Sequence, residues 1–351
     1  MAATLRRGER SIPPYSPIGS RILAFGGYQP DQVVTNDDLA RRVDTNDEWI
    51  RSRVGIESRR VAGPEESVTD MATVAGGKAL AASGLSPADI DLVVVATCST
   101  ILPMPSVAAV AASRLGIIAP GAYDLNAACA GFCYALAAVS DSLKAGSARN
   151  ALVIGAEKMT DWLDWDDRST CIIFADGAGA AVVAAVPDGV PADSAGPRGD
   201  ERSLPPSTPG RFIGIGPVVW GSAGDQGNKI QVTSRTGAIT QDGQGVFRWA
   251  TSLHPVALQA CERAGISPAD LTAFIPHQAN LRIIEALARK LGIPRERVAD
   301  DIVHAGNTSS ASVPLALSRM AEQGRLESGT PALLMGFGAG LSYAAQVITL
   351  P

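Results

Sequence analysis

One feature of the amino-acid sequence limits the fold more than any other: a pattern that repeats at a fixed spacing. Residues 84–90 (GLSPADI) recur as residues 265–271 (GISPADL), a separation of 181 positions (265 − 84). Two further pairs of segments have the same separation: residues 125–130 with 306–311, and residues 151–152 with 332–333. Three matches at one offset are poorly explained by chance. The sequence therefore predicts two copies of one α/β unit.

Each copy alternates strand patterns with helical patterns. Residues 90–96, apolar except for Asp91, and residues 152–155 are apolar runs, which are typical of strands buried on both faces in α/β proteins. Residues 67–83 and 107–115 have helical patterns, and a third helical pattern, rich in alanine and leucine, follows Cys129. The expected fold class is therefore α/β.

Composition divides the 351 residues into four segments. Residues 1–20 contain arginines but lack the apolar centre of a signal peptide, so we expect a disordered extension. Residues 187–211 are rich in Pro, Gly, Ser and Asp, which is typical of a linker or an exposed loop. The first half of the duplicated unit is then expected at residues 21–186. The second half is expected at residues 212–351, beginning with a strand-like pattern at 212–215.

Charge and cysteine pattern argue against several classes of function. The formal net charge of −5 gives no basis for general nucleic-acid binding. The apolar runs are too short to span a bilayer, so we expect no membrane partner. The five cysteines are an odd, scattered set without metal-ligand spacing, which fits a reducing cytoplasm and argues against a metal site.

Cys129 is the first candidate for a catalytic residue, because it falls where a predicted helix begins. Unpaired backbone N–H groups and the positive end of the helix dipole both stabilise a thiolate, the nucleophilic form of cysteine. The small neighbours Ala128, Ala130 and Gly131 leave room for a substrate carbonyl. A buried structural cysteine is the alternative interpretation, and this stretch alone does not separate the two.

Two polar residues of the second copy join it as candidates. His277 ends the apolar strand that follows the second Ser-Pro-Ala-Asp segment, and Asn307 precedes a helix at the position equivalent to Asn126 (307 − 126 = 181). Ligands of open α/β sheets bind at such strand ends. The other two histidines, His254 and His304, are interpreted as structural or supporting residues.

Duplication gives a reason for these candidates to meet. Cys129, His277 and Asn307 all lie at strand ends or helix starts of the repeated unit, so we expect them to converge at one seam. Ser310 is the counterpart of Cys129 (310 − 129 = 181) and should occupy the equivalent helix start. A cysteine with histidine and asparagine suits acyl transfer, in which the thiol is the nucleophile and the other two donate hydrogen bonds.

A set of short motifs then points to a known family. They occur in this order: DEWI at 47–50, RVGI at 53–56, ACAGF at 128–132, DRST at 167–170, FADGAGA at 174–180, PHQAN at 276–280, GNTSSAS at 306–312 and FGAG at 337–340. The ordered set is specific, although each motif alone is weak. From about residue 21 to residue 351 the sequence resembles β-ketoacyl-acyl-carrier-protein synthase III, of the thiolase superfamily. The resemblance implies a duplicated five-layer αβαβα fold.

The resemblance also implies a reaction. Cys129 would take an acyl group from acyl-CoA as a thioester, and malonyl-acyl-carrier protein would then lose CO2 and condense with it. His277 and Asn307 would donate to the thioester oxygen where enolate charge develops. Backbone N–H groups of Cys129 and of the loop 337–340 would form the oxyanion hole. The products would be 3-oxoacyl-acyl-carrier protein, CoA and CO2. No cofactor is expected, since the CoA thioester is a substrate.

Binding residues follow from the same resemblance. Trp49 would stack on the adenine of CoA with Arg168 on the other face, and Arg53 would line the CoA channel. Arg282 matches a position implicated in carrier-protein docking, and Arg289 extends its charge along a helical pattern at 280–291.

A homodimer is expected as well. Met104 aligns with the position that a partner subunit contributes to the acyl pocket, and plain interface packing is the alternative for this residue.

Three other interpretations share much of this pattern. A priming ketosynthase or acyltransferase of a polyketide pathway would carry the same motifs as the starter condensing enzyme of fatty-acid synthesis. A catalytically dead carrier-protein-binding homologue is disfavoured by the intact Cys129, His277 and Asn307. A hydroxymethylglutaryl-CoA synthase would need a catalytic glutamate, and the sequence suggests none at the seam.

Overall fold

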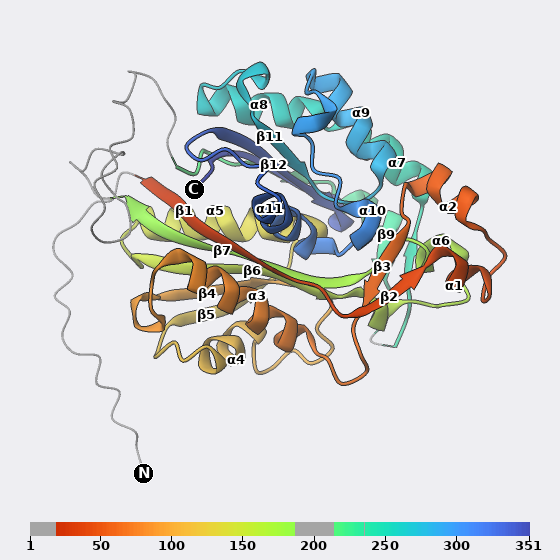
Figure 1. Ribbon diagram of the computed structural model, residues 1–351, viewed down its shortest axis with the longest axis horizontal. Helices are drawn as coiled ribbons and strands as arrows, with labels where there is room; N and C mark the ends of the chain where they lie inside the picture. The colour runs from red at the N-terminus through yellow and green to blue at the C-terminus, as the bar shows by residue number, and fades with distance from the viewer. Residues whose placement is uncertain (1–18, 187–213, 235) are drawn as a thin grey trace, which may run out of the picture.

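Two β-sheets lie one above the other in the computed structural model, with helices between them and on both outer faces (Figure 1). The structure describes residues 19–186, 214–234 and 236–351. The segments expected to be an N-terminal extension and a linker therefore fall almost entirely outside the described residues, and the predicted domain boundaries stay a prediction.

The first sheet has the strand order β1-β7-β6-β4-β5. Its strands are β1 (Gly19–Tyr28), β4 (Leu92–Ala96), β5 (Gly121–Leu125), β6 (Asn150–Lys158) and β7 (Asp176–Val186). The pairs β4–β5 and β4–β6 are parallel, whereas β7 runs antiparallel to both β6 and β1.

The second sheet repeats four of these five positions: its order β11-β12-β13-β8 corresponds to β4-β6-β7-β1 in the first sheet. Its strands are β8 (Val219–Ser222), β11 (Ala273–Pro276), β12 (Pro331–Gly338) and β13 (Ser342–Thr349). Residues 214–215 form no strand, because Ile215 makes only an isolated bridge to Ile348. The strand expected at 212–215 was therefore wrong in its described part, and the edge strand begins four residues later.

Helices complete five layers (Figure 1). In the middle lie α5 (Gly131–Lys144) and α11 (Ser312–Glu322). Outside the first sheet lie α3 (Val68–Ser83) and α4 (Val107–Arg114), and outside the second lie α7 (Gly243–Ser252), α8 (His254–Ala264) and α9 (Leu281–Leu291). The expected five-layer αβαβα fold is confirmed.

Strand register shows that the duplication extends to the pairing of individual residues. Leu92 pairs with Ala151 in the first sheet, and Ala273 pairs with Ala332 in the second, so both partners shift by 181 (273 − 92; 332 − 151). The two short 3₁₀ turns η2 (Ala128–Ala130) and η7 (Ser309–Ala311) precede α5 and α11 in the same way.

Side-chain alternation explains why the strands read as continuous apolar runs. In β4, Val94 packs into the central layer, while Val93 and Val95 pack against the outer helices. The central layer also contains Phe132 of α5 and Leu317 of α11. Successive side chains of a strand point to opposite faces, and both faces here are covered, so every position is apolar.

Shorter elements gather at one end of the layers, on the right of Figure 1. They are β2 (Gln32–Thr35), β3 (Ser58–Val61), β9 (Ile230–Val232), β10 (Ile239–Gln241), α1 (Asn36–Ala40), α2 (Asp47–Val54), α6 (Arg168–Cys171) and α10 (Ile302–Ala305). Within the described ranges, no helix has the length and apolar character needed to cross a membrane.

Candidate active site

A cavity of about 750 Å³ opens at the seam between the two halves. Cys129 of η2, His277 after β11 and Asn307 before η7 all line it. The structure therefore brings together the three residues that the sequence singled out. We call this cavity the seam chamber. No group of three His, Cys, Asp or Glu side chains suited to hold a metal ion occurs in the described part of the chain.

Cys129 lies in a turn that packs so closely against Gly338 that residue 338 has no space for a side chain. Ala128 has a positive φ of 47°, a left-handed conformation that is rare outside glycine. A Cβ on Gly338 would lie 2.6 Å from the Cβ of Cys129, so only glycine allows this close approach. The turn thus presents the thiol to the chamber beneath the end of β12.

Burial raises the pKa of the Cys129 thiol to about 11, and the carboxylate of Glu157 acts in the same direction. The Ser309 side chain and the backbone N–H groups of Ala339 and Cys129 lower this pKa, but by less. The expectation of a stabilised thiolate was therefore wrong for the free enzyme. Desolvation raises the thiol pKa by more than the N-terminal end of the helix lowers it. The sulfur lies inside a chamber that could not be recognised from the sequence.

His277 is held in one orientation by Ser312. The Ser312 Oγ accepts the N–H of Gln278 at 3.3 Å and lies 2.7 Å from His277 Nδ1. If the Ser312 hydroxyl donates to Nδ1, the neutral ring carries its own proton on Nε2. Burial lowers the pKa of His277 to about 3, so the imidazole is neutral at physiological pH. It can act in the chamber as a neutral hydrogen-bond donor.

Asn307 is fixed through both its backbone and its side chain. Its N–H donates to Ile173 at 2.9 Å, and its carbonyl accepts from Ala175 at 3.0 Å. Its Oδ1 accepts the N–H of Ser309 at 2.9 Å, so the amide nitrogen Nδ2 is left to face the chamber. Asn126 makes the equivalent bond to Ala128 at 3.0 Å, as the duplication predicts.

The mouth of the chamber carries the residues expected to bind CoA. Trp49 and Arg53 line it, and the Arg53 guanidinium lies 5.7 Å from the centre of the indole. Arg168 lies over the same ring at 4.8 Å but does not line the chamber. An adenine entering between Trp49 and Arg168 must therefore displace this contact.

The predicted docking residues occupy different positions. Arg282 lines the chamber mouth, with its guanidinium 5.6 Å from the centre of the Phe247 ring. Arg289 is exposed in the last turn of α9, outside the chamber. Arg282 therefore faces both the channel and the surface, whereas Arg289 belongs to the surface alone.

Met104 does not line the chamber of its own chain. Its side chain is 76% exposed, and the neighbouring Ile101 and Leu102 are 53% and 71% exposed. These three side chains form one exposed apolar loop.

Several residues near the site escaped the sequence reasoning. Ser312 and Ser309 lie within a recognised motif, but their hydrogen-bond partners come from distant segments. Glu157 is fully buried beside the seam, where it accepts from Cys98 and Ser309. The sequence was expected to supply no catalytic glutamate at the seam, and this buried glutamate was not anticipated. Glu157 does not line the chamber, however, and its two oxygens are occupied by donors.

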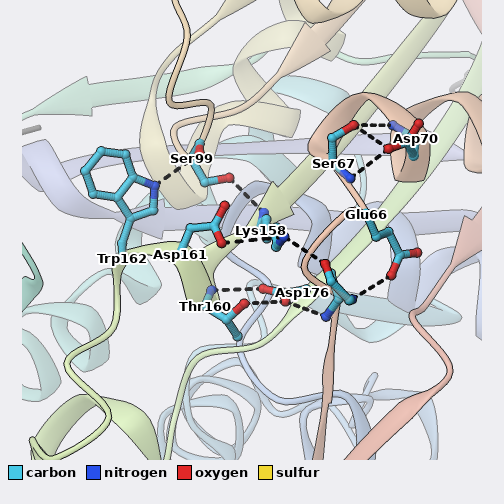
Figure 2. A network of polar contacts seen from close by, with 11 residues as sticks. Glu66, Ser67, Asp70, Ser99, Lys158, Thr160, Asp161, Trp162 and Asp176 are labelled. Carbon is cyan, nitrogen blue, oxygen red and sulfur yellow. Dashed lines mark hydrogen bonds and ion pairs between the residues drawn. The ribbon is translucent and has the colours of Figure 1, made fainter. Parts of the chain in front are cut away.

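A polar network continues from this region toward the outer layer (Figure 2). The Ser99 hydroxyl accepts the N–H of Lys158 at 2.8 Å, and Lys158 Nζ donates to the carbonyl of Gly63 at 2.9 Å. Asp176 accepts from Thr160 in the same view, and burial raises the pKa of its carboxyl to about 6. The end of β6 is thus held by polar contacts on the side away from the chamber.

Comparison with known proteins agrees with this geometry. Family models for 3-oxoacyl-acyl-carrier-protein synthase III match residues 123–194, and those for its C-terminal part match residues 261–350. A β-ketoacyl-acyl-carrier-protein synthase III from Streptomyces coelicolor is 53% identical over 95% of this chain and 99% of its own length. The chain belongs to the β-ketoacyl-acyl-carrier-protein synthase III family. It is thus an acyltransferase of the condensing-enzyme type.

Solved structures place this synthase III chain among two kinds of relatives. A priming β-ketosynthase from the R1128 polyketide biosynthetic pathway has a TM-score of 0.86 and 42% identity, covering 96% of this chain and 98% of its own. The 3-oxoacyl-acyl-carrier-protein synthase III of Aquifex aeolicus has a TM-score of 0.83 and 38% identity, covering 94% and 100%.

The raised thiol pKa leads to a test of Cys129 in this synthase. Alkylation of Cys129 by iodoacetamide should accelerate about tenfold per pH unit up to roughly pH 9, because the thiolate stays a minor species below a pKa of about 11. The measurement is the pH dependence of Cys129 modification, followed by mass spectrometry of its tryptic peptide. Glutathione is the control, since its rate levels off near an ordinary thiol pKa. An alkylation rate of Cys129 that levels off below pH ~7 would show that the helix start lowers the thiol pKa by more than burial raises it.

Proposed function

We propose that this enzyme catalyses the starter condensation of type II fatty-acid synthesis. Acyl-CoA and the Cys129 thiol exchange to give acyl-Cys129 and free CoA. Malonyl-acyl-carrier protein then loses CO2, and the carbanion attacks the acyl carbonyl, which returns the thiol and yields 3-oxoacyl-acyl-carrier protein. The observation that carries the proposal is one chamber with a thiol and two neutral donors, His277 and Asn307, on its wall.

Backbone donors support the acylation step. The backbone N–H groups of Cys129 and Ala339 lower the pKa of the Cys129 thiol, so they are available near the sulfur, where an oxyanion would form on an attached acyl group. Gly338 leaves space for that carbonyl, since any side chain there would strike the sulfur. Deprotonation of a thiol with a pKa of about 11 is part of the barrier to this step.

Neutral donors suit the decarboxylation step. Charge develops on the thioester oxygen only as CO2 leaves, and preorganised donors stabilise that charge most in a dry site. His277 stays neutral because its pKa is depressed to about 3, so its Nε2–H can donate without losing a proton. Asn307 offers Nδ2 because its oxygen is already bonded to Ser309.

The proposed enzyme binds CoA at the chamber mouth and acts in the cytoplasm. Trp49 and Arg53 at the chamber mouth, with Arg168 over the Trp49 ring, bind the nucleotide end of CoA through stacking and charge. The CoA thioester is a substrate, and no cofactor takes part. All five cysteines are free, which fits an enzyme of the reducing cytoplasm.

The half-reactions give the decisive test. Cys129→Ala should gain no acyl mass after incubation with acyl-CoAs, because the nucleophile is gone. His277→Ala and Asn307→Ala should still be acylated, but CO2 release from malonyl-acyl-carrier protein should fall about 10²–10³-fold, the typical cost of one oxyanion donor. Intact-protein mass spectrometry and labelled CO2 release measure the two steps.

Cys133→Ala is the matched control for the first variant, since Cys133 is buried one helical turn away and does not line the chamber. Acyl mass on the Cys129→Ala protein would contradict the nucleophile assignment. Unchanged CO2 release by either donor variant would remove that donor from the mechanism. Acylation by a series of acyl-CoAs also gives the chain-length preference.

Carrier-protein docking is proposed to use Arg282 and Arg289. Carrier proteins of this pathway are acidic, so reversing a surface charge weakens their encounter most at low salt. Arg289→Glu should raise the apparent KM for malonyl-acyl-carrier protein about threefold or more at low salt, with acylation by acyl-CoA unchanged. Steady-state kinetics at two salt concentrations measure this effect.

Arg149→Glu is the control for charge reversal, since it precedes β6 at the end opposite to the chamber. Arg282→Glu should slow both half-reactions, because Arg282 also lines the chamber mouth. An Arg289→Glu protein with the parent KM at low salt would exclude this arginine from docking.

We also propose a homodimer in which the loop of Ile101, Leu102 and Met104 enters the partner subunit's acyl pocket. The exposure of three large apolar side chains within four residues supports a protein partner, since monomers rarely leave such a group in water. Leu102→Asp should shift the protein toward monomer in sedimentation velocity and slow acylation. A parent protein that sediments as a monomer would contradict the proposal.

A polyketide priming role is the second candidate. The structural similarity to the R1128 priming ketosynthase favours it. Competition between fatty-acid and polyketide carrier proteins, each loaded with malonate, distinguishes the two pathways by relative kcat/KM.

A further inference from the structure

Glu157 is a buried acidic residue that the reaction above does not use. Its side chain has no solvent exposure, and donors from both halves surround it. From the end of β4 come the Thr97 hydroxyl at 3.1 Å, the Cys98 N–H at 3.0 Å and the Ser99 hydroxyl at 2.5 Å. From η7 come the Ser309 hydroxyl at 3.1 Å, the Ser310 N–H at 3.3 Å and the Ser310 hydroxyl at 2.7 Å.

No cation balances this carboxylate among the residues that the structure describes, where its partners are hydroxyls, backbone N–H groups and one thiol. The next residue, Lys158, lies on the opposite face of β6, since successive strand residues point to opposite sides. Its Nζ is directed to Gly63 and to Asp161, 3.5 Å away (Figure 2). A buried carboxylate held only by hydrogen bonds is costly, and such groups cluster at functional sites.

The duplicated position shows that the fold itself does not require a carboxylate there. Glu157 corresponds to Gly338 (338 − 157 = 181), which packs against Cys129. Each strand end thus faces the turn of the opposite copy, Gly338 facing η2 and Glu157 facing η7. Glycine leaves space for a nucleophile, whereas glutamate fills the space and binds the turn.

The bound turn is the one that orients Asn307. Ser309 has a φ of 49°, a left-handed conformation that strains a residue other than glycine. In this conformation its N–H meets Asn307 Oδ1 at 2.9 Å, while its hydroxyl donates to Glu157. Contacts to the neighbouring Ser310 hold the same turn. Asn307 can present Nδ2 to the chamber only while this turn keeps its shape.

We propose that Glu157 is a positioning residue that acts through Ser309 to orient the Asn307 amide for decarboxylation. The inference rests on the proposed function, because its readout is CO2 release from malonyl-acyl-carrier protein. Glu157 touches neither substrate nor reacting atoms, so its loss should affect the step that needs Asn307. Acylation of Cys129 should not slow, since removing a neighbouring negative charge does not disfavour a thiolate.

A double-mutant cycle tests this role. Glu157→Gln keeps the shape of the side chain and should reduce CO2 release by acylated enzyme at least about tenfold, with acylation preserved. In the Asn307→Ala background the same substitution should change CO2 release less than about twofold, because its target is gone. Asp124→Asn is the control for loss of a carboxylate acceptor in the same sheet, since Asp124 accepts from the N–H groups of Val107 and Ala108 at the start of α4.

Each outcome decides one point. Equal losses in both backgrounds, or a parallel loss of acylation, would show a general structural role and overturn the proposal. If the Glu157 proposal fails but the unmutated enzyme is acylated and releases CO2, the proposed function still stands. An unmutated enzyme that does neither would overturn the proposed function itself. Thermal unfolding checks that each variant is folded. If Glu157→Gln does not fold, Glu157→Asp takes its place in the cycle, since it retains charge but withdraws from η7.

Discussion

The structure depends on one packing constraint: two sheets share a single central layer of helices. α5 and α11 bury the inner faces of both sheets, and residues such as Phe132 and Leu317 belong to one continuous core. Each helix begins directly after a 3₁₀ turn, so the packing that closes the core also sets where the two turns meet. The seam chamber is therefore positioned by core geometry, and rigid elements hold its donors.

Burial in that chamber then determines the chemistry. Desolvation raises the pKa of the Cys129 thiol to about 11 and lowers the pKa of His277 to about 3, so it favours the neutral form of both. Negative charge develops on the thioester oxygens only during the reaction. Backbone N–H groups, His277 and Asn307 are already in place to donate hydrogen bonds to these oxygens. Glu157 lies outside the chamber and holds the η7 turn, which orients Asn307, through its contact with Ser309.

Much of the site could be predicted because the duplication constrains it. The offset of 181 pairs Ala128 with Ser309, and both have nearly the same positive φ. Glu157 was missed because it lies near the end of an apolar strand, and its donors come from the segment after β4 and from η7, far away in the sequence. The thiolate expected at Cys129 was wrong for a related reason, since the helix start is local but the desolvation is not.

The sequence by itself determined the repeated α/β unit, the five layers that its resemblance implies, and the residues that meet at the seam. Repeats, apolar runs and motif order are properties of neighbouring residues, so they can be read along the chain. Only the tertiary structure decided the protonation of Cys129, the Ser312 contact that orients His277 and the direction of the Asn307 amide. Those properties depend on distances and desolvation between segments that only folding brings together.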